Sequence, residues 1–300
     1  MQKNKEELLE NLCLVHGLEN NQGYADTLIK DIKLFRISCN EDILPLLYNR
    51  GFIFIGRGMK KGYIAEREFI NTPDDYLMIT SPQPIECETC IYDEHSMIGL
   101  YVNLDMNRLR RIVSKYNEFS KYSDTNKKVP YNVVCNKRTD EITDVFYRLL
   151  KILQSELDSK MLASSILDEL YFRILEDTSG YILQQLCEHG SSFSRVSKVI
   201  EFIHKNLKEK ICIEEMAELA GMSPNNFHRI FKEALNDTPV QYIKKVRLNK
   251  ARQLILHENM KAVKASEEVG YDSPTQFNRE FKRYFGASPG KVKELGYSGF

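Results

Sequence analysis

The chain has 300 residues, of which 42% are hydrophobic and 28% charged. That length allows about two domains, and the composition excludes a disordered protein. The formal net charge is zero, but residues 191–300 hold 19 Lys and Arg against 13 Asp and Glu, a net charge of +6, which leaves −6 on residues 1–190. Since no run of eighteen apolar residues occurs, we expect a cytoplasmic protein with no membrane partner. Seven scattered cysteines indicate reduced thiols rather than a disulfide framework.

The first third of the chain has the pattern of short strands. After an opening helix from Met1 to Glu10, turn-forming residues separate several short segments with β-strand composition. The expected strands are Leu28–Ser38, Phe52–Ile55, Lys61–Phe69, Tyr76–Thr80 and Met97–Leu104. Many short strands at this spacing favour a small β-barrel or sandwich.

From Asn107 onward the apolar residues follow helical periodicity, with expected helices at Ile142–Leu157 and Ile166–Leu175. We expect residues 107–190 to link the domains and to join two copies of the chain, with Ile166–Leu175 as a candidate dimer contact. A linker is expected at Gly190–Ser192, where the charge changes sign. The prediction is an α+β protein, with an N-terminal domain over 1–190 and an all-α domain over 191–300.

An internal repeat is the strongest feature of the sequence. The ten residues from Ser223 to Lys232 recur from Ser273 to Lys282 with six identities. Each copy begins with Ser as a helix N-cap and Pro at the first helical position, and Gln276 completes a capping box with Ser273. Both copies therefore predict the start of a helix.

Each repeated helix has one apolar and one polar face. In the first copy Phe227, Ile230, Phe231 and Ala234 form one stripe, which predicts a core contact. The opposite faces carry residue types that read bases and neutralise phosphates. These are Asn225, Arg229 and Lys232, flanked by His228, and Thr275, Arg279 and Lys282, flanked by Asn278.

A second short helix precedes each repeated helix, over Ile213–Ala220 and Val263–Val269, and a glycine follows each. This order is typical of a helix-turn-helix unit, whose second helix enters the major groove. Between the units, a capping box at Thr238 starts a helix that continues to His257, about 30 Å long. Successive major grooves are about 34 Å apart, so one chain could occupy two adjacent grooves.

These residues also resemble the AraC/XylS-type transcription regulators. The motifs are IEEMAELAGMS from Ile213, FHRIFK from Phe227, and VGY from Val269 through FGASP, ending at Pro289. The similarity covers about residues 193–296 and implies a seven-helix DNA-binding domain. It also implies base or backbone contacts for Asn225, His228, Arg229, Thr275, Gln276 and Arg279.

The N-terminal part resembles the cupin-like sensor domain found in one branch of that family, on the runs GFIFIGRG from Gly51 and GLYVNLD from Gly99. The resemblance implies an effector pocket inside a small barrel and a helical segment that joins two copies. Candidate pocket residues are Phe52, Phe54, Arg57, Tyr63 and Tyr101, of which Arg57 would bind an acidic group of the effector. The alternative is that these aromatic side chains are ordinary core.

We therefore expect a transcription regulator that binds double-stranded promoter DNA as a homodimer and responds to a small-molecule or protein effector. An activator would also contact RNA polymerase. The sequence leaves open the operator, the effector, the oligomeric state and the choice between activation and repression. A scaffold whose basic faces meet an acidic protein is the alternative without DNA.

Two chemical alternatives depend on few residues. Cys87, Cys90 and His95 could form a metal or redox site, but no second cysteine pair accompanies them. A metal-dependent cupin enzyme needs several histidines, and only His16 and His95 lie in the expected barrel region. We therefore expect that the protein binds no cofactor and is not an enzyme.

Overall fold

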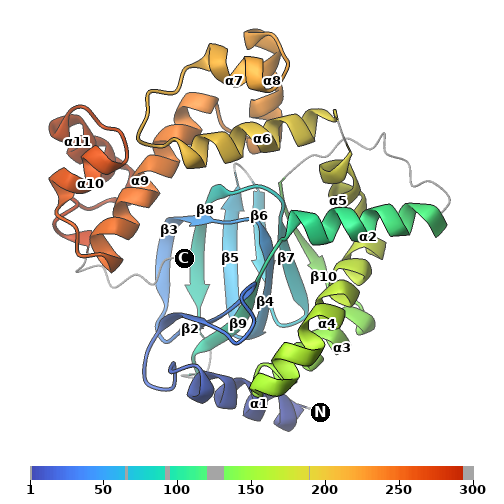
Figure 1. The fold of residues 1–300 in the computed structure, drawn as a ribbon. Helices are drawn as coiled ribbons and strands as arrows, with labels where there is room; N and C mark the ends of the chain where they lie inside the picture. Colours follow the sequence, from blue (N-terminus) through green and yellow to red (C-terminus); the bar gives the residue numbers. More distant parts are fainter. Residues whose placement is uncertain (1, 65–66, 92–94, 120–131, 189, 293–300) are drawn as a thin grey trace.

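The computed structural model describes residues 2–64, 67–91, 95–119, 132–188 and 190–292 (Figure 1). The N-terminal part contains two antiparallel β-sheets with helices against one of them. The larger sheet has the strand order β1-β2-β9-β4-β7-β10 and the smaller one the order β3-β8-β5-β6. The strands are β1 (Gly23–Asp26), β2 (Ile32–Ile37), β3 (Glu41–Tyr48), β4 (Gly51–Arg57), β5 (Met59–Ile64), β6 (Arg67–Asn71), β7 (Asp75–Ile79), β8 (Gln83–Cys90), β9 (Met97–Asn103) and β10 (Val133–Lys137).

The two sheets pack face to face and, in the described residues, do not close into the expected small barrel, so the sandwich is the one of the two expected architectures that is present. Apolar side chains such as Ile53, Tyr101 and Ile85 form an inter-sheet core. Within the described residues, no strand ladder joins one sheet to the other, so each sheet keeps two edge strands. The architecture is a β-sandwich with helices on one side.

Some expected strands have different limits in the structure. The strand expected at Lys61–Phe69 is a hairpin of β5 and β6, whose residues 65 and 66 lie outside the described ranges. Strands β3 and β8 pair with each other but were not expected, since both contain proline. The expected strands at the β2, β4, β7 and β9 positions are present with shifted ends.

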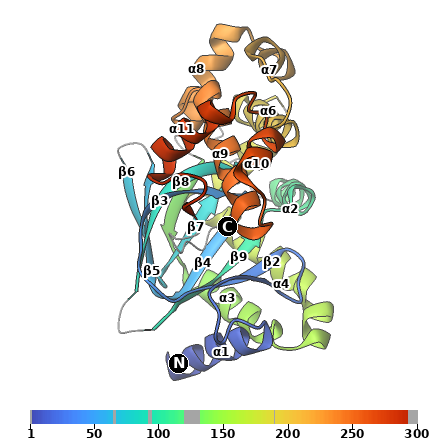
Figure 2. The same ribbon diagram turned by 90° about the vertical axis from the view of Figure 1, so that its left-hand side faces the viewer.

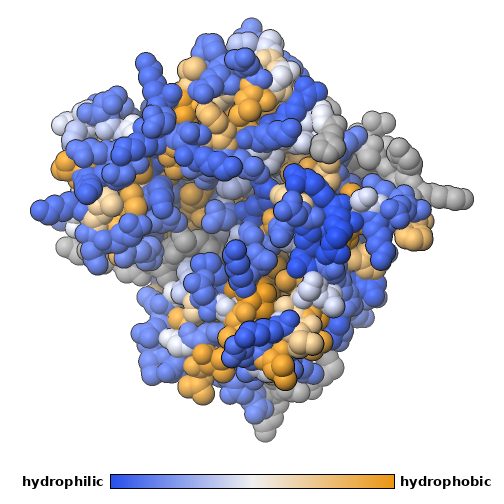
Figure 3. Space-filling view, in the orientation of Figure 1, coloured by the Kyte–Doolittle hydropathy of each residue, from blue (hydrophilic) through white to orange (hydrophobic). Residues whose placement is uncertain are grey.

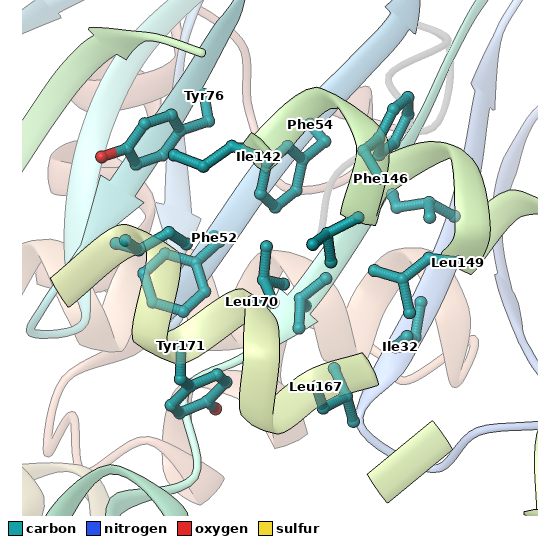
Figure 4. Close-up of a cluster of buried hydrophobic side chains, with 14 of the residues drawn as sticks. Ile32, Phe52, Phe54, Tyr76, Ile142, Phe146, Leu149, Leu167, Leu170 and Tyr171 are labelled. Atoms are coloured by element: carbon teal, nitrogen blue, oxygen red, sulfur yellow. The ribbon is translucent and has the colours of Figure 1, made fainter. Parts of the chain in front are cut away.

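Helices cover the other face of the larger sheet. They are α1 (Gln2–Val15), α3 (Asp140–Ile152) and α4 (Glu156–Glu176), while α2 (Met106–Phe119) and α5 (Gly180–Cys187) pack beside them. Figure 4 shows Phe52 and Phe54 from the sheet pointing at Phe146, Leu170 and Tyr171 from the helices. We call this cluster the helix-facing core.

Most apolar residues of Ile166–Leu175, the candidate dimer contact, face the core of their own chain. Ile166, Leu167, Leu170 and Ile174 are buried within the same chain, in the helix-facing core. Exposed apolar side chains occur one or two turns earlier on the same helix, at Leu157, Met161 and Leu162. In Figure 3 apolar side chains gather low in the view, over α1 and α4.

The remaining helices lie across one end of the sandwich (Figures 1 and 2). They are α6 (Ser192–Lys205), α7 (Ile213–Leu219), α8 (Pro224–Leu235), α9 (Pro239–His257), α10 (Ala262–Glu268) and α11 (Pro274–Phe285). Helix α6 begins directly after Ser191, whose hydroxyl accepts a hydrogen bond from the Ser194 amide at 3.0 Å. Among the described residues, no helix is long and apolar enough to cross a membrane.

Candidate nucleic-acid interface

The first helix-turn-helix unit consists of α7 and α8. Gly221 between them has a φ of +61°, a left-handed conformation that glycine adopts without steric cost. The amide of Met222 returns to the Ala217 carbonyl at 2.9 Å and closes the turn. Phe227 and Phe231 are fully buried against α6 and α9, so the opposite face of α8 points outward.

The second unit repeats this arrangement with α10 and α11. Gly270 has a φ of +81°, and the Tyr271 amide donates to the Ser266 carbonyl at 3.0 Å. A Cβ atom on Gly270 would lie 2.7 Å from the carbonyl oxygens of Leu207 and Lys208. Glycine is therefore required here both by the backbone angle and by the space available.

The structure places all nine candidate DNA-binding residues on the exposed faces of the two repeated helices. On α8 they are Asn225, His228, Arg229 and Lys232, and on α11 they are Thr275, Gln276, Asn278, Arg279 and Lys282. Because the phenylalanine stripes fix the rotation of both helices, the packing of the core holds these faces outward. The arrangement can present amide, guanidinium and ammonium donors to base edges and phosphates.

Two of these side chains have intramolecular partners that the sequence pattern does not predict. Arg229 pairs with Glu233 at 2.8 Å and donates to Asn226 Oδ1 at 2.9 Å. The side-chain nitrogen of Gln276 donates to Glu280 at 3.2 Å. Of the expected capping box, the bond from the backbone N–H of Gln276 to the Ser273 hydroxyl is present at 3.3 Å. The side chain of Gln276 is directed to Glu280 instead.

Helix α9 belongs to the cores of both units. Tyr242 and Val246 pack with α8, while Leu248, Ala251 and Leu254 pack with α11. Its 19 residues give a rod of about 28 Å. One rigid helix therefore connects the cores of the two units, and its length is comparable with the spacing of major grooves.

The C-terminal helices also contact the sandwich through polar groups. Tyr242 Oη donates to the Pro82 carbonyl at 2.5 Å, and Arg50 binds Glu201 at 2.9 Å. Asn132 Nδ2 donates to the Ala234 carbonyl at 2.7 Å, at the last turn of α8. We call these three contacts, on Pro82, Arg50 and Asn132, the interdomain contact.

His204 forms a hydrogen bond with Tyr242 of the interdomain contact. His204 Nε2 lies 2.9 Å from Tyr242 Oη. Because Tyr242 gives its only proton to Pro82, Nε2 must be the protonated nitrogen of a neutral imidazole that donates to Tyr242. Burial, and secondly the positive charge of Arg50, lower the pKa of His204 to about 4. The histidine is thus neutral at pH 7.

The structure places the five candidate effector residues on different faces of the sandwich and does not bring them together. Phe52 and Phe54 point into the helix-facing core, whereas Tyr101 belongs to the inter-sheet core. Arg57 is engaged by Glu6 and Glu10 of α1 at 2.9 and 2.7 Å, and Tyr63 Oη donates to Glu88 on the next strand. Successive residues of a strand face opposite sides of the sheet, and Tyr101 pairs with Ile53, so Tyr101 faces away from Phe52 and Phe54.

The hollows in the structure have other linings. A cavity of about 10 Å³ between the sheets, room for one water molecule, is lined by aromatic side chains and the buried polar residues Lys60 and Asn71. Open hollows of about 660 Å³ and 750 Å³ lie between α2 and α4 and between α1 and β5, the second of them beside Arg57 and His95.

Cys87 and Cys90 are not arranged as a redox or metal pair. They are three positions apart on strand β8, so their Cα atoms are about 10 Å apart, beyond the reach of a disulfide. Cys87 is buried between the sheets, and burial raises the pKa of its thiol. No group of three potential metal ligands occurs among the described residues.

Comparison with known families gives two matches. Residues 216–294 match a helix-turn-helix domain, and residues 28–182 match the N-terminus of AraC-type transcriptional regulators. The second match alone spans more than half of the chain.

Curated relatives match parts of the sequence. The HTH-type transcriptional regulator ArgR of Pseudomonas aeruginosa is 28% identical over 142 residues, 47% of this chain and 43% of that protein. The transcriptional activator RclR of Escherichia coli is 35% identical over 82 residues, 27% and 29% of the two chains. The chain spans about half the length of the first curated relatives it matches.

Among solved structures, the unsaturated fatty acid bound form of wild-type ToxT from Vibrio cholerae superposes with a TM-score of 0.60. The superposition covers 94% of this chain and 99% of that chain at 10% sequence identity. At this identity the likeness concerns the fold alone, and it extends over both the sandwich and the C-terminal helices.

Proposed function

The chain belongs to the AraC-type family of transcriptional regulators, and from this membership we propose that it binds promoter DNA at specific sequences with both of its helix-turn-helix units. The observation that carries the proposal is the pair of outward polar faces on α8 and α11, held by the shared helix α9. Residues 191–300 carry a net charge of +6, which favours binding to a polyanion.

Substitutions on the two faces test this function. Arg229→Ala and Arg279→Ala should each cost about 1 to 3 kcal/mol at one defined base position of the bound site. Lys232→Ala and Lys282→Ala should weaken all sequences alike and reduce the salt dependence, because they contact phosphates. Equal losses on specific and random DNA for all four variants would contradict base reading by the arginines. If the chain bound an acidic protein and did not bind DNA, the alternative function as an interaction scaffold would be favoured.

We further propose that the N-terminal part responds to an effector and biases DNA binding through the interdomain contact. The Vibrio cholerae protein was solved with an unsaturated fatty acid bound, which supports the presence of an effector. The cavity between the sheets holds about one water molecule, so a ligand there must separate the sheets. Strand β3 of that sandwich contacts α9 and α11.

An effector can change DNA affinity only if it binds the two states of the protein differently. Ligands can be screened by the rise in unfolding temperature of the full-length chain, and each hit retested on promoter DNA. A ligand that binds and leaves both DNA affinity and promoter output unchanged would contradict the proposed switch.

For the homodimer, we propose the exposed residues Leu157, Met161 and Leu162 of α4 as the contact. Exposed apolar side chains on one helix are a typical interaction surface. Met161→Glu should convert a dimer to a monomer in light scattering at micromolar concentration. A monomeric wild type, or a dimer unaffected by Met161→Glu, would contradict this assignment.

A further inference from the structure

The two repeats differ at one position in a way that bears on base recognition. Glu280 occupies the place that Ile230 holds in the first copy, and the side chain of Glu280 is only 8% exposed. A charged group at a core position is costly unless other groups satisfy it. Its partners therefore reveal what it does.

Three donors surround the Glu280 carboxylate. Gln276 Nε2 and Lys244 Nζ lie 3.2 and 3.5 Å from Oε1, and Tyr271 Oη donates to Oε2 at 2.9 Å. Burial alone would raise the pKa of Glu280, but the hydrogen bonds and the Lys244 charge hold it below its ordinary value. The group is ionised at neutral pH and can only accept hydrogen bonds.

An acceptor fixes the orientation of the amide that donates to it. The nitrogen of Gln276 must face Glu280, so its oxygen faces away from the carboxylate on the exposed side of α11. Asn226 holds the equivalent position in the first copy with the opposite orientation. Its oxygen accepts from Arg229, which can only donate, and this leaves the nitrogen outward.

We propose that Glu280 is a specificity-determining residue that fixes Gln276 as a hydrogen-bond acceptor toward the DNA. In the major groove the donors that such an acceptor can meet are the exocyclic amines of adenine and cytosine. The second half-site then selects adenine or cytosine at the position that Gln276 reads, and rejects guanine and thymine. This inference rests on the proposed function.

The test is selection from a random DNA library by the full-length protein, compared among wild type, Gln276→Ala, Glu280→Gln and Glu280→Ile. Glu280→Gln keeps the shape but supplies both a donor and an acceptor, so Gln276 can turn over. Glu280→Ile places the residue of the first copy at this position. Glu233→Gln, in the first unit, is the matched control for the second half-site, and unfolding curves confirm that each variant folds.

We expect Gln276→Ala to flatten the preference at one position of the second half-site. Both Glu280 variants should admit guanine or thymine there, reducing discrimination about fivefold or more, while the Glu233→Gln profile in that half-site stays as in wild type. A wild-type preference for guanine or thymine at the Gln276-dependent position would overturn the inference. The inference would also be overturned if Gln276→Ala left the base preference of the bound site unchanged, or weakened binding to all sequences equally. Absence of any selected sequence, in wild type as well, would instead reject the regulatory function itself.

Discussion

Tyr242 Oη donates to the carbonyl oxygen of Pro82 at 2.5 Å, although the two residues belong to different parts of the fold, α9 and the turn before β8. Tyr242 also packs edge-on against Phe231 of the first recognition helix, with ring centroids 5.5 Å apart. One side chain thus contacts both the sandwich and the element proposed to read DNA.

Tyr242→Phe should weaken this connection while keeping the aromatic packing. The variant loses the hydrogen bond to Pro82 and leaves His204 without its acceptor, which should lower the free energy of unfolding by about 1 to 3 kcal/mol. Promoter binding should also depend less on the effector. Denaturant unfolding and DNA binding measure the two effects.

Tyr63→Phe is the control, since its hydroxyl faces Glu88 on the sheet surface. If Tyr242→Phe behaves like Tyr63→Phe in both measurements, the interdomain contact has no role in coupling.

His204 should make the stability of the protein pH-dependent. Its pKa is about 4 in the fold and about 6.5 in the unfolded chain, so between these values the unfolded chain binds a proton that the fold does not. Its contribution is complete above pH 6.5 and is lost as the pH falls toward 4, by up to about 3 kcal/mol.

His204→Gln can still donate to Tyr242 but does not titrate. Urea unfolding at pH 7.5 and pH 5 should therefore show a smaller loss for the variant than for wild type. An equal loss in both proteins would assign the pH dependence to other groups.

Gly270→Ala should destabilise the protein more than Gly221→Ala. Both glycines have positive φ, and this alone costs alanine about 1 to 2 kcal/mol. At Gly270 the added methyl group also meets two backbone carbonyls at 2.7 Å, whereas at Gly221 the nearest atom is 3.9 Å away. We expect thermal unfolding to rank the variants in this order. The reverse order would show that the second turn differs from the described one.

Glu233→Gln should strengthen DNA binding. The substitution releases Arg229 from its ion pair and removes a negative charge beside the expected phosphates. Because exposed ion pairs are weak, we expect only a twofold to fivefold gain, of the order such pairs provide. Titration of labelled operator at low and physiological salt measures it. Glu258→Gln at the far end of α9 should have no effect, and an equal gain there would indicate a general charge effect.

The sequence predicted the C-terminal half better than the N-terminal half for a physical reason. The repeat, its caps and its glycine turns are local signals, and the nine candidate DNA-binding residues lie on the exposed faces of α8 and α11. Which of them contact DNA stays a prediction. The sequence shows that Glu280 stands in the second copy where the first copy has Ile230, and this difference indicates a polar partner at that position. Only the structure shows that the partner is Gln276.

Pairing between strands that are distant in the sequence has no local signal from which it can be predicted. Strands β3 and β8 carry Pro45 and Pro84, which obscure their alternation, and they pair only with residues far along the chain. Aromatic residues at Phe52, Phe54 and Tyr101 were correctly placed in strands, but the register that sends them to opposite faces is a tertiary property. The interdomain contact on Arg50, Pro82 and Asn132 has no local signature.

Sequence-specific DNA binding can be measured by selection of genomic DNA fragments with the full-length protein at physiological salt and with competitor DNA, because nonspecific electrostatic binding is screened under these conditions. We expect an enriched site that contains two short half-motifs about one helical turn apart, one for each of α8 and α11. Tight binding without any enriched sequence, or no binding by either the full-length chain or residues 191–300 alone, would contradict it.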